Sequence, residues 1–243
     1  MPDIDYGLDS PRLVRRFTGR AAMFILFAAI LYIANRTGSP STVAPLAGIL
    51  LAIGLIFGTI AAVMVLSSRV VKPRVCQRIL DSIPWRGDES VLDVGCGRGL
   101  FLIDAAKRLK AGKATGVDIW DTAELSGNSA EAVQRNAKAS GVQGRVKIET
   151  ADVRQLPFPG DSFDVVLSSL ALHNISSGEE RAKAVNEIAR VLKPGGYLAI
   201  FDIFQTASYA KILKQLSFTD LRLSPVTFLW CVPTRTLTAR KPT

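Results

Sequence analysis

The residues with the clearest chemical potential form a turn with Gly95, Gly97 and Gly99 at alternate positions. The turn follows the apolar run 90–94, in which Asp93 stands two residues before the first glycine. Glycines permit backbone conformations that other residues rarely adopt and let a ligand approach the main chain, while N–H groups at the start of the next helix are free to bind it. The dinucleotide fingerprint differs, because its third glycine comes three positions after the second. The turn predicts a ligand site built largely from backbone.

The only histidine, His173, closely follows an apolar segment at 163–169 that is typical of a strand. In open parallel sheets, ligands bind at the carboxyl ends of the strands. We therefore expect His173 to face the same site as the glycine turn. An imidazole readily takes up a proton near neutral pH, so His173 is a candidate general base. The alternative is that it shapes the pocket or bonds a loop carbonyl.

The cysteines indicate neither a metal site nor a disulfide framework. There are three, Cys76, Cys96 and Cys231, and they are widely spaced. An odd number without metal-ligand spacing favours a reducing compartment. We expect no metal cofactor.

From residue 90 onward, short apolar segments alternate with helical stretches. Strands are predicted at 90–94, 114–118, 146–150, 163–169, 197–203, 220–224 and 234–240, and helices at 100–110, 128–140, 178–192 and 208–215. Such alternation implies right-handed crossovers and a sheet with helices on both faces, and the last two strands favour an antiparallel pair. We predict an α/β fold with a doubly wound, mainly parallel seven-stranded sheet. A short amphipathic helix near 75–83 would lead into it.

Five sequence elements, in order, resemble the class I S-adenosylmethionine-dependent methyltransferases. The first is an acidic residue before G-x-G-x-G, here Asp93 and the turn at 95–99. The others are Gly116-Val117-Asp118, Ala151-Asp152-Val153, the pair Leu156-Pro157-Phe158 and Phe163-Asp164-Val165-Val166, and Leu192-Lys193-Pro194-Gly195-Gly196. The resemblance covers nearly all of residues 75–243. It implies S-adenosylmethionine as cofactor and methyl transfer as the reaction.

The resemblance also implies where the methionine part of the cofactor binds. It assigns this part to the glycine turn, that is, to Gly95, Cys96, Gly97 and Gly99. Asp93 would orient the amino group, directly or through water. Ser168, at the end of the fourth strand, would help hold the same end, although ordinary strand-end hydrogen bonding explains it equally well.

For the nucleoside part, the resemblance implies contacts after the second and third strands. Asp118 would accept hydrogen bonds from both ribose hydroxyls, which suits a group with only acceptors. Ile119 and Trp120 follow it, and Trp120 would pack against the adenine, with ordinary packing as the alternative. Asp152 would bond the exocyclic amine while Val153 packs on the ring.

The acceptor pocket is expected around His173 and Asn174, with Phe228 and Trp230 from an unusually apolar segment near the carboxyl end. The alternative for both aromatic residues is burial in a strand. The segment 121–128 is a second candidate for the pocket rim. An Asp/Asn-Pro-Pro-aromatic motif, found in many methyltransferases of DNA and protein amino groups, is absent after the fourth strand, which disfavours nucleic acid as a partner.

The first third of the chain reads as a transmembrane hairpin, so we divide the chain into an anchor at 1–70 and a methyltransferase domain at 71–243. Residues 43–66 carry no charge and are long enough, as a helix, for a hydrocarbon core of about 30 Å. The run 17–35 is a shorter candidate helix. A buried soluble helix is the alternative for either, and a signal peptide for the first.

Basic residues flank this hairpin on one side. Residues 1–80 hold 9 basic and 3 acidic side chains, so most of the net charge of +9 lies there. By the positive-inside bias, both termini and the catalytic domain are cytoplasmic, at the inner membrane. Gly54, Gly58 and Ala62 form a ridge of small residues, whose uses are packing against the first helix, which we favour, and homodimer formation.

These features together predict a membrane-anchored methyltransferase that acts on a lipophilic small molecule of the quinone, isoprenoid, lipid, thiol or phenol type. Two alternatives stay open: methylation of a membrane protein partner, and a non-catalytic cofactor-binding sensor or assembly module.

Overall fold

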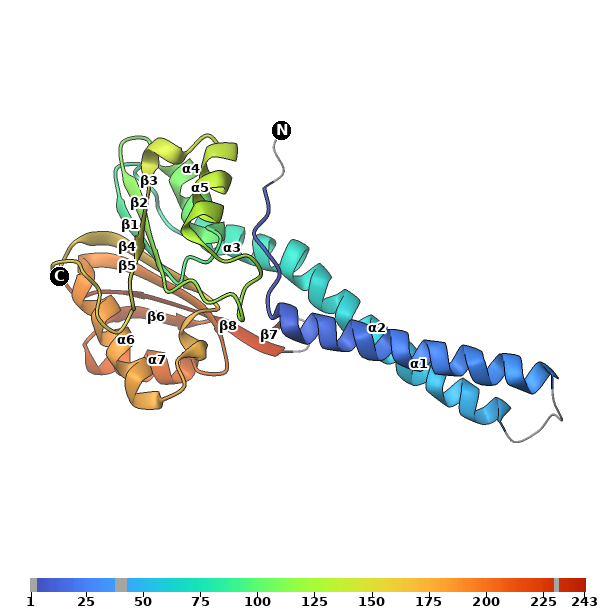
Figure 1. The fold of residues 1–243 in the computed structure, drawn as a ribbon. Coiled ribbons are helices and arrows are strands. Elements are labelled where there is room, and N and C mark those ends of the chain that lie inside the picture. Colours follow the sequence, from blue (N-terminus) through green and yellow to red (C-terminus); the bar gives the residue numbers. More distant parts are fainter. Residues whose placement is uncertain (1–3, 38–42, 230–231) are drawn as a thin grey trace.

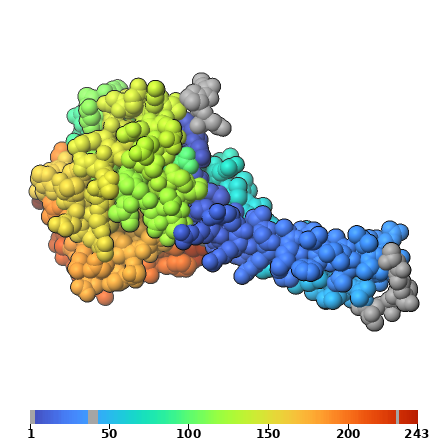
Figure 2. Space-filling view, viewed as in Figure 1, coloured from blue at the N-terminus to red at the C-terminus, as the bar shows by residue number. Residues whose placement is uncertain are grey.

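The computed structural model describes residues 4–37, 43–229 and 232–243. Within them, a sheet covered by helices carries a pair of long helices that projects away from it (Figure 1). The space-filling view shows this pair as a rod attached to a rounded body (Figure 2).

The sheet has the strand order β3-β2-β1-β4-β5-β8-β6, with β7 paired to β8. The strands are β1 Ser90–Val94, β2 Lys113–Asp118, β3 Val146–Thr150, β4 Phe163–Ser169, β5 Leu192–Ile203, β6 Thr219–Leu223, β7 Thr227–Leu229 and β8 Val232–Arg240. Strands β1 to β5 are parallel, and β8 runs antiparallel to β5, β6 and β7. The α/β prediction is confirmed as a mixed sheet.

The predicted number of seven strands is wrong, because β7 is an eighth strand in the described part of the chain. It has only three residues, and Pro225 and Pro233 stand close to its two ends. A segment this short shows no alternating pattern, so the sequence predicts a connector there. Its partner β8 begins only a few residues later, and Phe228 pairs with Pro233.

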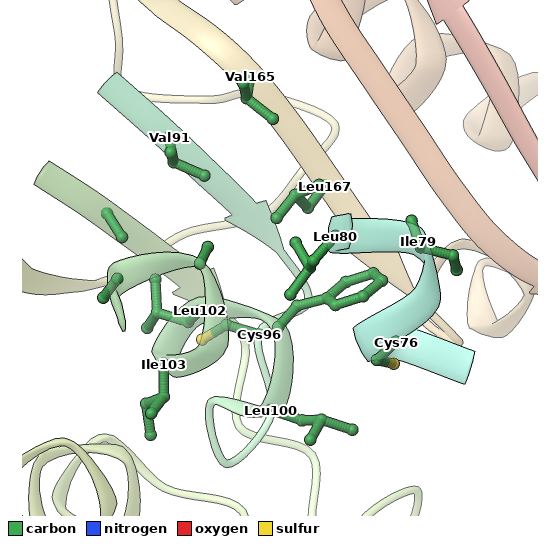
Figure 3. Close-up of a cluster of buried hydrophobic side chains, with 14 of the residues drawn as sticks. Cys76, Ile79, Leu80, Val91, Cys96, Leu100, Leu102, Ile103, Val165 and Leu167 are labelled. Atoms are coloured by element: carbon green, nitrogen blue, oxygen red, sulfur yellow. The ribbon is translucent and has the colours of Figure 1, made fainter. Parts of the chain in front are cut away.

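Five helices cover the two faces of the sheet: α3 Lys72–Asp81, α4 Leu100–Arg108, α5 Ala130–Ala139, α6 Gly178–Val191 and α7 Thr206–Gln215. The alternation of β-strand side chains separates two apolar cores. One core joins α3, α4 and α5 to Val91 and Leu167 (Figure 3). The other joins α6 and α7 to Leu92 and Val166. Because both faces are buried, the central strands are mostly apolar.

The projecting pair consists of α1 Pro11–Thr37 and α2 Ala44–Leu66. Helix α1 starts earlier than predicted, because Pro11 fits the first turn of a helix. A π-helical turn at Ser67–Val71 joins α2 to α3, so α3 continues directly from the pair. Both helices are long and apolar enough to cross a membrane, by length and composition. Many large apolar side chains on them are exposed, among them Leu26 and Ile56.

Two residues of the predicted ridge, Gly54 and Gly58, face α1, whereas Ala62 is exposed. Gly54 is buried, and a Cβ added there would lie 2.7 Å from Cγ1 of Ile25 and 3.2 Å from the carbonyl oxygen of Ala21. A Cβ at Gly58 would lie 3.8 Å from Cβ of Ala21. The ring of Phe57 stacks with nearby rings of α1. Gly54 therefore brings the two helices into close contact within one chain.

Candidate active site

A cavity of about 360 Å³ lies at the carboxyl ends of β1, β2, β4 and β5. The strand order reverses between β1 and β4, which is where open α/β sheets bind ligands. The cavity brings together most of the residues predicted from the sequence. Those that line it are Asp93, Gly95, Cys96, Gly97, Asp118, Ile119, Asp152, Val153, His173 and Asn174.

The glycine turn presents its backbone to this cavity. Gly95 has φ +69° and Gly97 has φ +55°, which disfavour other residues. A Cβ at Gly95 would lie 2.2 Å from Cβ of Ala171, and one at Gly97 would lie 2.8 Å from Leu125. Gly99 does not line the cavity; it is the N-cap of α4. The turn is therefore a cradle that side chains would fill.

Asp93 is buried under the turn. Its Oδ2 accepts a hydrogen bond from the N–H of Leu102 at 2.9 Å, and its Oδ1 has no partner among the described residues. Burial raises the pKa of Asp93 to about 7, because the charged form loses hydration. An unpaired buried carboxylate oxygen at a cavity wall is expected to receive a donor from a ligand.

Asp118 connects the glycine turn to the rim of the cavity. Its Oδ2 accepts from the N–H of Gly97 at 2.8 Å, and its Oδ1 accepts from the N–H of Trp120 at 2.7 Å and from Nδ2 of Asn128 at 3.1 Å. A carboxylate has about four lone-pair sites, so these bonds leave room for a ribose hydroxyl. Asn128 belongs to the segment 121–128, and four of its residues line the cavity as the predicted rim.

Trp120 does not reach the cavity. Its indole N–H donates to Oγ1 of Thr150 at 2.8 Å, and its side chain packs against the core under α4. Its φ of +65° turns the chain at this point, and Ile119, 66% exposed, lines the cavity instead. The apolar surface beside Asp118 is thus formed by Ile119, one residue before the Trp120 that the sequence indicates.

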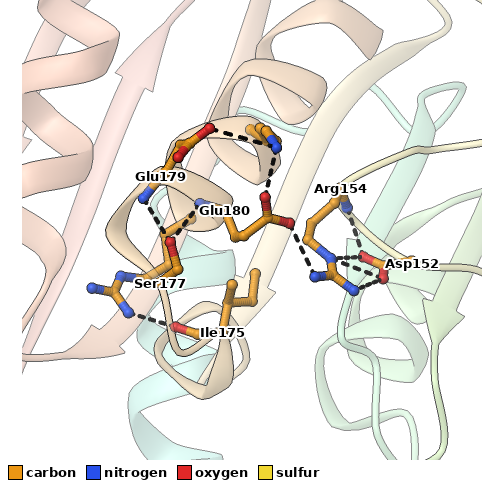
Figure 4. A network of polar contacts seen from close by, with 8 residues as sticks. Asp152, Arg154, Ile175, Ser177, Glu179 and Glu180 are labelled. Carbon is orange, nitrogen blue, oxygen red and sulfur yellow. Dashed lines mark hydrogen bonds and ion pairs between the residues drawn. The ribbon is translucent and has the colours of Figure 1, made fainter.

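Asp152 lies at the cavity with both oxygens engaged by the same side chain. The guanidinium of Arg154 donates to Oδ1 and Oδ2 of Asp152, and also to Oε2 of Glu180 at 3.0 Å (Figure 4). The hydrogen bonds from Arg154 hold the pKa of Asp152 below its usual range. Asp152 therefore stays ionised, an acceptor at the cavity fixed by α6 and its own loop.

His173 forms a dyad with a residue that sequence reasoning missed, Asp202. Nδ1 of His173 lies 2.5 Å from Oδ1 of Asp202, and the backbone N–H of His173 donates to Oδ2 at 3.0 Å. Asp202 is fully buried at the end of β5 and also accepts from the hydroxyl of Tyr209 at 3.3 Å. A carboxylate accepts the proton on Nδ1 and so leaves Nε2 as the acceptor for the cavity. An acidic residue at the end of a buried strand is the signal that could have identified it.

Two other predicted residues, Ser168 and Phe228, lie elsewhere. Ser168 is buried and does not line the cavity, whereas its neighbour Ser169 does. Successive side chains of a strand point to opposite faces, so the prediction is displaced by one residue. Phe228 is 68% exposed outside the cavity, while Leu229 lines it. Trp230 falls outside the described residues.

The residues present fit S-adenosylmethionine, as the resemblance implies. The methionine amino group matches the unpaired Oδ1 of Asp93, the glycine cradle leaves space for the chain beside it, and Asp118 and Ile119 supply a polar and an apolar surface for the nucleoside. All of these groups line the same cavity, and His173 lines it from the turn after β4.

Comparison with known proteins supports the same assignment. Residues 92–200 match the family model of the methyltransferase domain. The chain is 35% identical over 138 residues to 27-O-demethylrifamycin SV methyltransferase of Amycolatopsis mediterranei, and 36% identical over 124 residues to a sterol 4-C-methyltransferase of Caenorhabditis elegans. It is 30% identical over 145 residues to a ubiquinone/menaquinone biosynthesis C-methyltransferase of Geotalea daltonii. These matches cover 56%, 51% and 59% of this chain, and 47%, 34% and 57% of those relatives.

Solved structures support the fold. A SAM-dependent methyltransferase from Aquifex aeolicus superposes with a TM-score of 0.53 at 20% identity, over 68% of this chain and 88% of that one. A geranyl diphosphate methyltransferase in complex with SAM gives a TM-score of 0.53 at 15% identity, over 70% of this chain and 85% of that one. With the family match and the geometry of the cavity, residues 92–200 are identified as a methyltransferase domain whose cavity fits S-adenosylmethionine as its cofactor.

Proposed function

We propose that this protein is a membrane-anchored methyltransferase that methylates a lipophilic small molecule of the quinone, isoprenoid, lipid, thiol or phenol type. The observation that carries the proposal is the position of the His173–Asp202 dyad. His173 lines the same cavity as the cofactor residues, together with apolar residues such as Ile203 and Leu229.

The dyad suits an acceptor that must lose a proton. S-adenosylmethionine supplies a methyl group bonded to a sulfonium sulfur. This sulfur is an activated leaving group, because it departs as a neutral thioether. The protein then has to align the acceptor and, for a hydroxyl, phenol or acidic carbon, remove its proton. Nε2 of His173 would take that proton, and Asp202 would stabilise the imidazolium that results. The role of Asp202 is comparable to that of the buried carboxylate in a serine-protease triad.

The apolar part of the cavity supports a lipophilic acceptor. Leu229, Val232 and Ile203 line it. Close by in sequence, Phe204 is 65% exposed and Phe228 68% exposed. Ser10, just before α1, and Lys72, the first residue of α3, line the same cavity as Leu229, so this apolar edge shares the cavity with the base of the helical pair. A water-soluble acceptor would gain little from such a surface.

The surface of the helical pair supports membrane anchoring. Many of its large apolar side chains are exposed, among them Leu26 and Ile56, and a bilayer would bury them. Basic side chains are exposed near the base, namely Arg12, Arg15, Arg16, Arg20, Arg69, Arg74 and Arg78. These would meet anionic headgroups on the cytoplasmic side. The catalytic domain would then sit on that surface, with the apolar edge of the cavity close to the lipid.

The relatives agree with this class of acceptor. Their names state a demethylrifamycin, a sterol and the biosynthesis of ubiquinone and menaquinone. The chain spans less than two thirds of the length of each relative. The activity proposed for the whole protein is therefore argued from the geometry of its own cavity.

The test is to identify the product. The full chain in detergent is incubated with S-adenosylmethionine labelled in the methyl group and a lipid extract of membranes, and labelled species are identified by mass spectrometry. We expect label in a lipid-soluble small molecule. Label in a protein would instead support a membrane protein as acceptor. Tight cofactor binding without transfer to any acceptor would support a sensor.

A matched variant tests the dyad in the same assay. We expect His173→Ala to lower turnover by about 10²- to 10⁴-fold, while the affinity for S-adenosylhomocysteine, measured by calorimetry, stays within about twofold. Turnover near the wild-type value would exclude His173 as the base.

A further inference from the structure

The N-terminal strap, residues 4–10, forms one wall of the cofactor cavity. Tyr6, Asp9 and Ser10 line the cavity. The strap bonds to the rim at 121–128: the N–H of Leu8 donates to Oγ of Ser126 at 2.8 Å, and the N–H of Ser126 donates to the carbonyl of Leu8 at 3.1 Å. The strap thus lies across the rim that Asn128 ties to Asp118.

The strap is also fixed to the glycine turn itself. Arg98, inside the turn, forms an ion pair with Asp5 at 3.0 Å. Nδ2 of Asn136, on α5, donates both to the carbonyl of Asp5 at 2.8 Å and to the carbonyl of Arg98 at 3.0 Å. One buried amide therefore joins the strap to the backbone of the cofactor cradle.

At its other end, the strap is fastened to the base of the helical pair. Nζ of Lys72 lies 2.8 Å from Oδ1 of Asp9, and Oγ of Ser68 donates to Oδ2 of Asp9 at 3.0 Å. Ser68 belongs to the π-helical turn between α2 and α3, and Lys72 is the first residue of α3. The side chains of Lys72 and Asp9 are only 13% and 15% exposed. Removing one partner would leave the other charge buried and unpaired, which is costly.

Lys72 lines the cavity together with Asp93. The methionine end of the cofactor is a zwitterion, an ammonium beside a carboxylate. The unpaired Oδ1 of Asp93 fits the ammonium. The ammonium of Lys72 has three donors, and the bond to Asp9 uses one of them. Arg98 and Arg154, the other cations at the cavity, are engaged by Asp5 and by Asp152 with Glu180. Lys72 is therefore the cation best placed for the carboxylate.

We propose that the base of the helical pair and the N-terminal strap complete the cofactor site: Lys72 binds the methionine carboxylate, and the cluster of Asp9, Ser68 and Lys72 fastens the strap over the cofactor. The helical pair is then part of the cofactor site and not a detachable anchor. This inference rests on the cofactor site alone and is independent of the acceptor proposed above.

The test compares two ligands on the full chain in detergent. S-adenosylhomocysteine carries the methionine carboxylate, whereas 5′-methylthioadenosine has the same nucleoside without the amino-acid end. We expect Lys72→Gln to weaken S-adenosylhomocysteine binding by about 10- to 100-fold, as for a lost hydrogen bond to a charged group. Binding of 5′-methylthioadenosine should change by less than about threefold. Calorimetry gives both dissociation constants.

Two variants complete the comparison. Arg74→Gln removes an exposed cation from the same helix and should leave both affinities within about twofold. Asp9→Asn should weaken both ligands by a similar, smaller factor, because it loosens the strap and keeps the Lys72 cation. In hydrogen exchange, S-adenosylhomocysteine should protect the amides of residues 4–10 in the wild type and much less in Asp9→Asn.

Two results would overturn the proposal. Unchanged affinity of Lys72→Gln for S-adenosylhomocysteine would show that Lys72 does not bind the carboxylate. Equal losses of affinity for both ligands in Lys72→Gln would show that Lys72 acts through the fold alone. In that case Lys72→Arg, which keeps the cation, should not restore the affinity for S-adenosylhomocysteine relative to that for 5′-methylthioadenosine. No acceptor is present in these assays, so their failure leaves the methyl acceptor question untouched.

Discussion

The half of the cavity at β1 and β2 is built from backbone and carboxylates that sequence motifs indicate, whereas the half at β4 and β5 rests on a pair of side chains, one from the turn after β4 and one from β5, that no motif joins. In the first half, Asp93, Gly97 and Asp118 are joined through the turn itself. In the second, His173 depends on Asp202, 29 residues further on. Motifs indicate the residues of the cofactor half and the pairing of β1 with β2 brings them together, while packing of β5 and α7 fixes the half that would do the proton chemistry.

Gly95 is where the two halves touch, and its replacement should have the largest effect. A Cβ there would lie 2.2 Å from Cβ of Ala171, at the start of the loop that carries His173. We expect Gly95→Ala to weaken S-adenosylhomocysteine binding by more than about 100-fold, because backbone strain and a clash inside the cradle add. Calorimetry on the detergent-solubilised chain measures this.

Gly141 offers a matched control for that variant. Its φ of +68° is close to the +69° of Gly95, but a Cβ there would meet nothing within 4 Å. Gly141→Ala should carry a similar backbone strain and leave ligand binding intact. Equal effects of the two variants would mean that strain, and not contact between the two halves, limits binding.

Asp202→Asn should have the next largest effect, and only on the second half. The variant removes the negative charge beside Nδ1 of His173, so we expect turnover to fall by about 100-fold with little change in S-adenosylhomocysteine affinity. Tyr209→Phe removes one hydrogen bond to the same carboxylate and should cost less than about fivefold. If Asp202→Asn loses cofactor binding and turnover together, the two halves are not separable.

The difference between the halves also explains what could be predicted from the sequence. The order of strands and helices follows from periodicity, because each central strand is buried on both faces and each helix on one. The cofactor residues Asp93, Gly95 and Asp118 follow from two motifs at the ends of β1 and β2, strands that pair with each other. Asp202 has no such motif, and only the pairing of β4 with β5 brings it to His173.

Other predictions fail by a single residue or by context. Ser169 lines the cavity in place of Ser168, because the strand alternates its faces, and Ile119 does so in place of Trp120, because a positive φ turns the indole away. Lys72 reads in the sequence as one more basic residue after an apolar helix. The structure buries it against Asp9, a partner 63 residues earlier, which no local pattern indicates.

A pH titration should sharpen the contrast from the cofactor side. Burial raises the pKa of Asp93 to about 7, and its ionised form is the one that accepts the ligand's ammonium. As the pH falls from 8 to 6, the carboxyl takes up a proton, and the ionised fraction drops about tenfold. We expect the S-adenosylhomocysteine dissociation constant to rise by about the same factor over this range.

Asp93→Asn is the control for that titration. It removes the ionisable group, so binding should be weaker than in the wild type at pH 8 and nearly independent of pH between 6 and 8. A wild-type profile that stays flat, or one that Asp93→Asn retains, would place the titrating group elsewhere.

The smallest effects separate the two neighbours Ile119 and Trp120. Ile119→Ala removes apolar surface from the cavity wall, and we expect S-adenosylhomocysteine to bind about three- to tenfold more weakly. Trp120→Ala should leave that affinity within about twofold, and it should lower the melting temperature instead, because the indole packs on the core and donates to Thr150. A loss of affinity in Trp120→Ala larger than in Ile119→Ala would show that the indole swings into the cavity when the cofactor binds. The cofactor half would then, like the other half, depend on a side chain that the local motif does not fix.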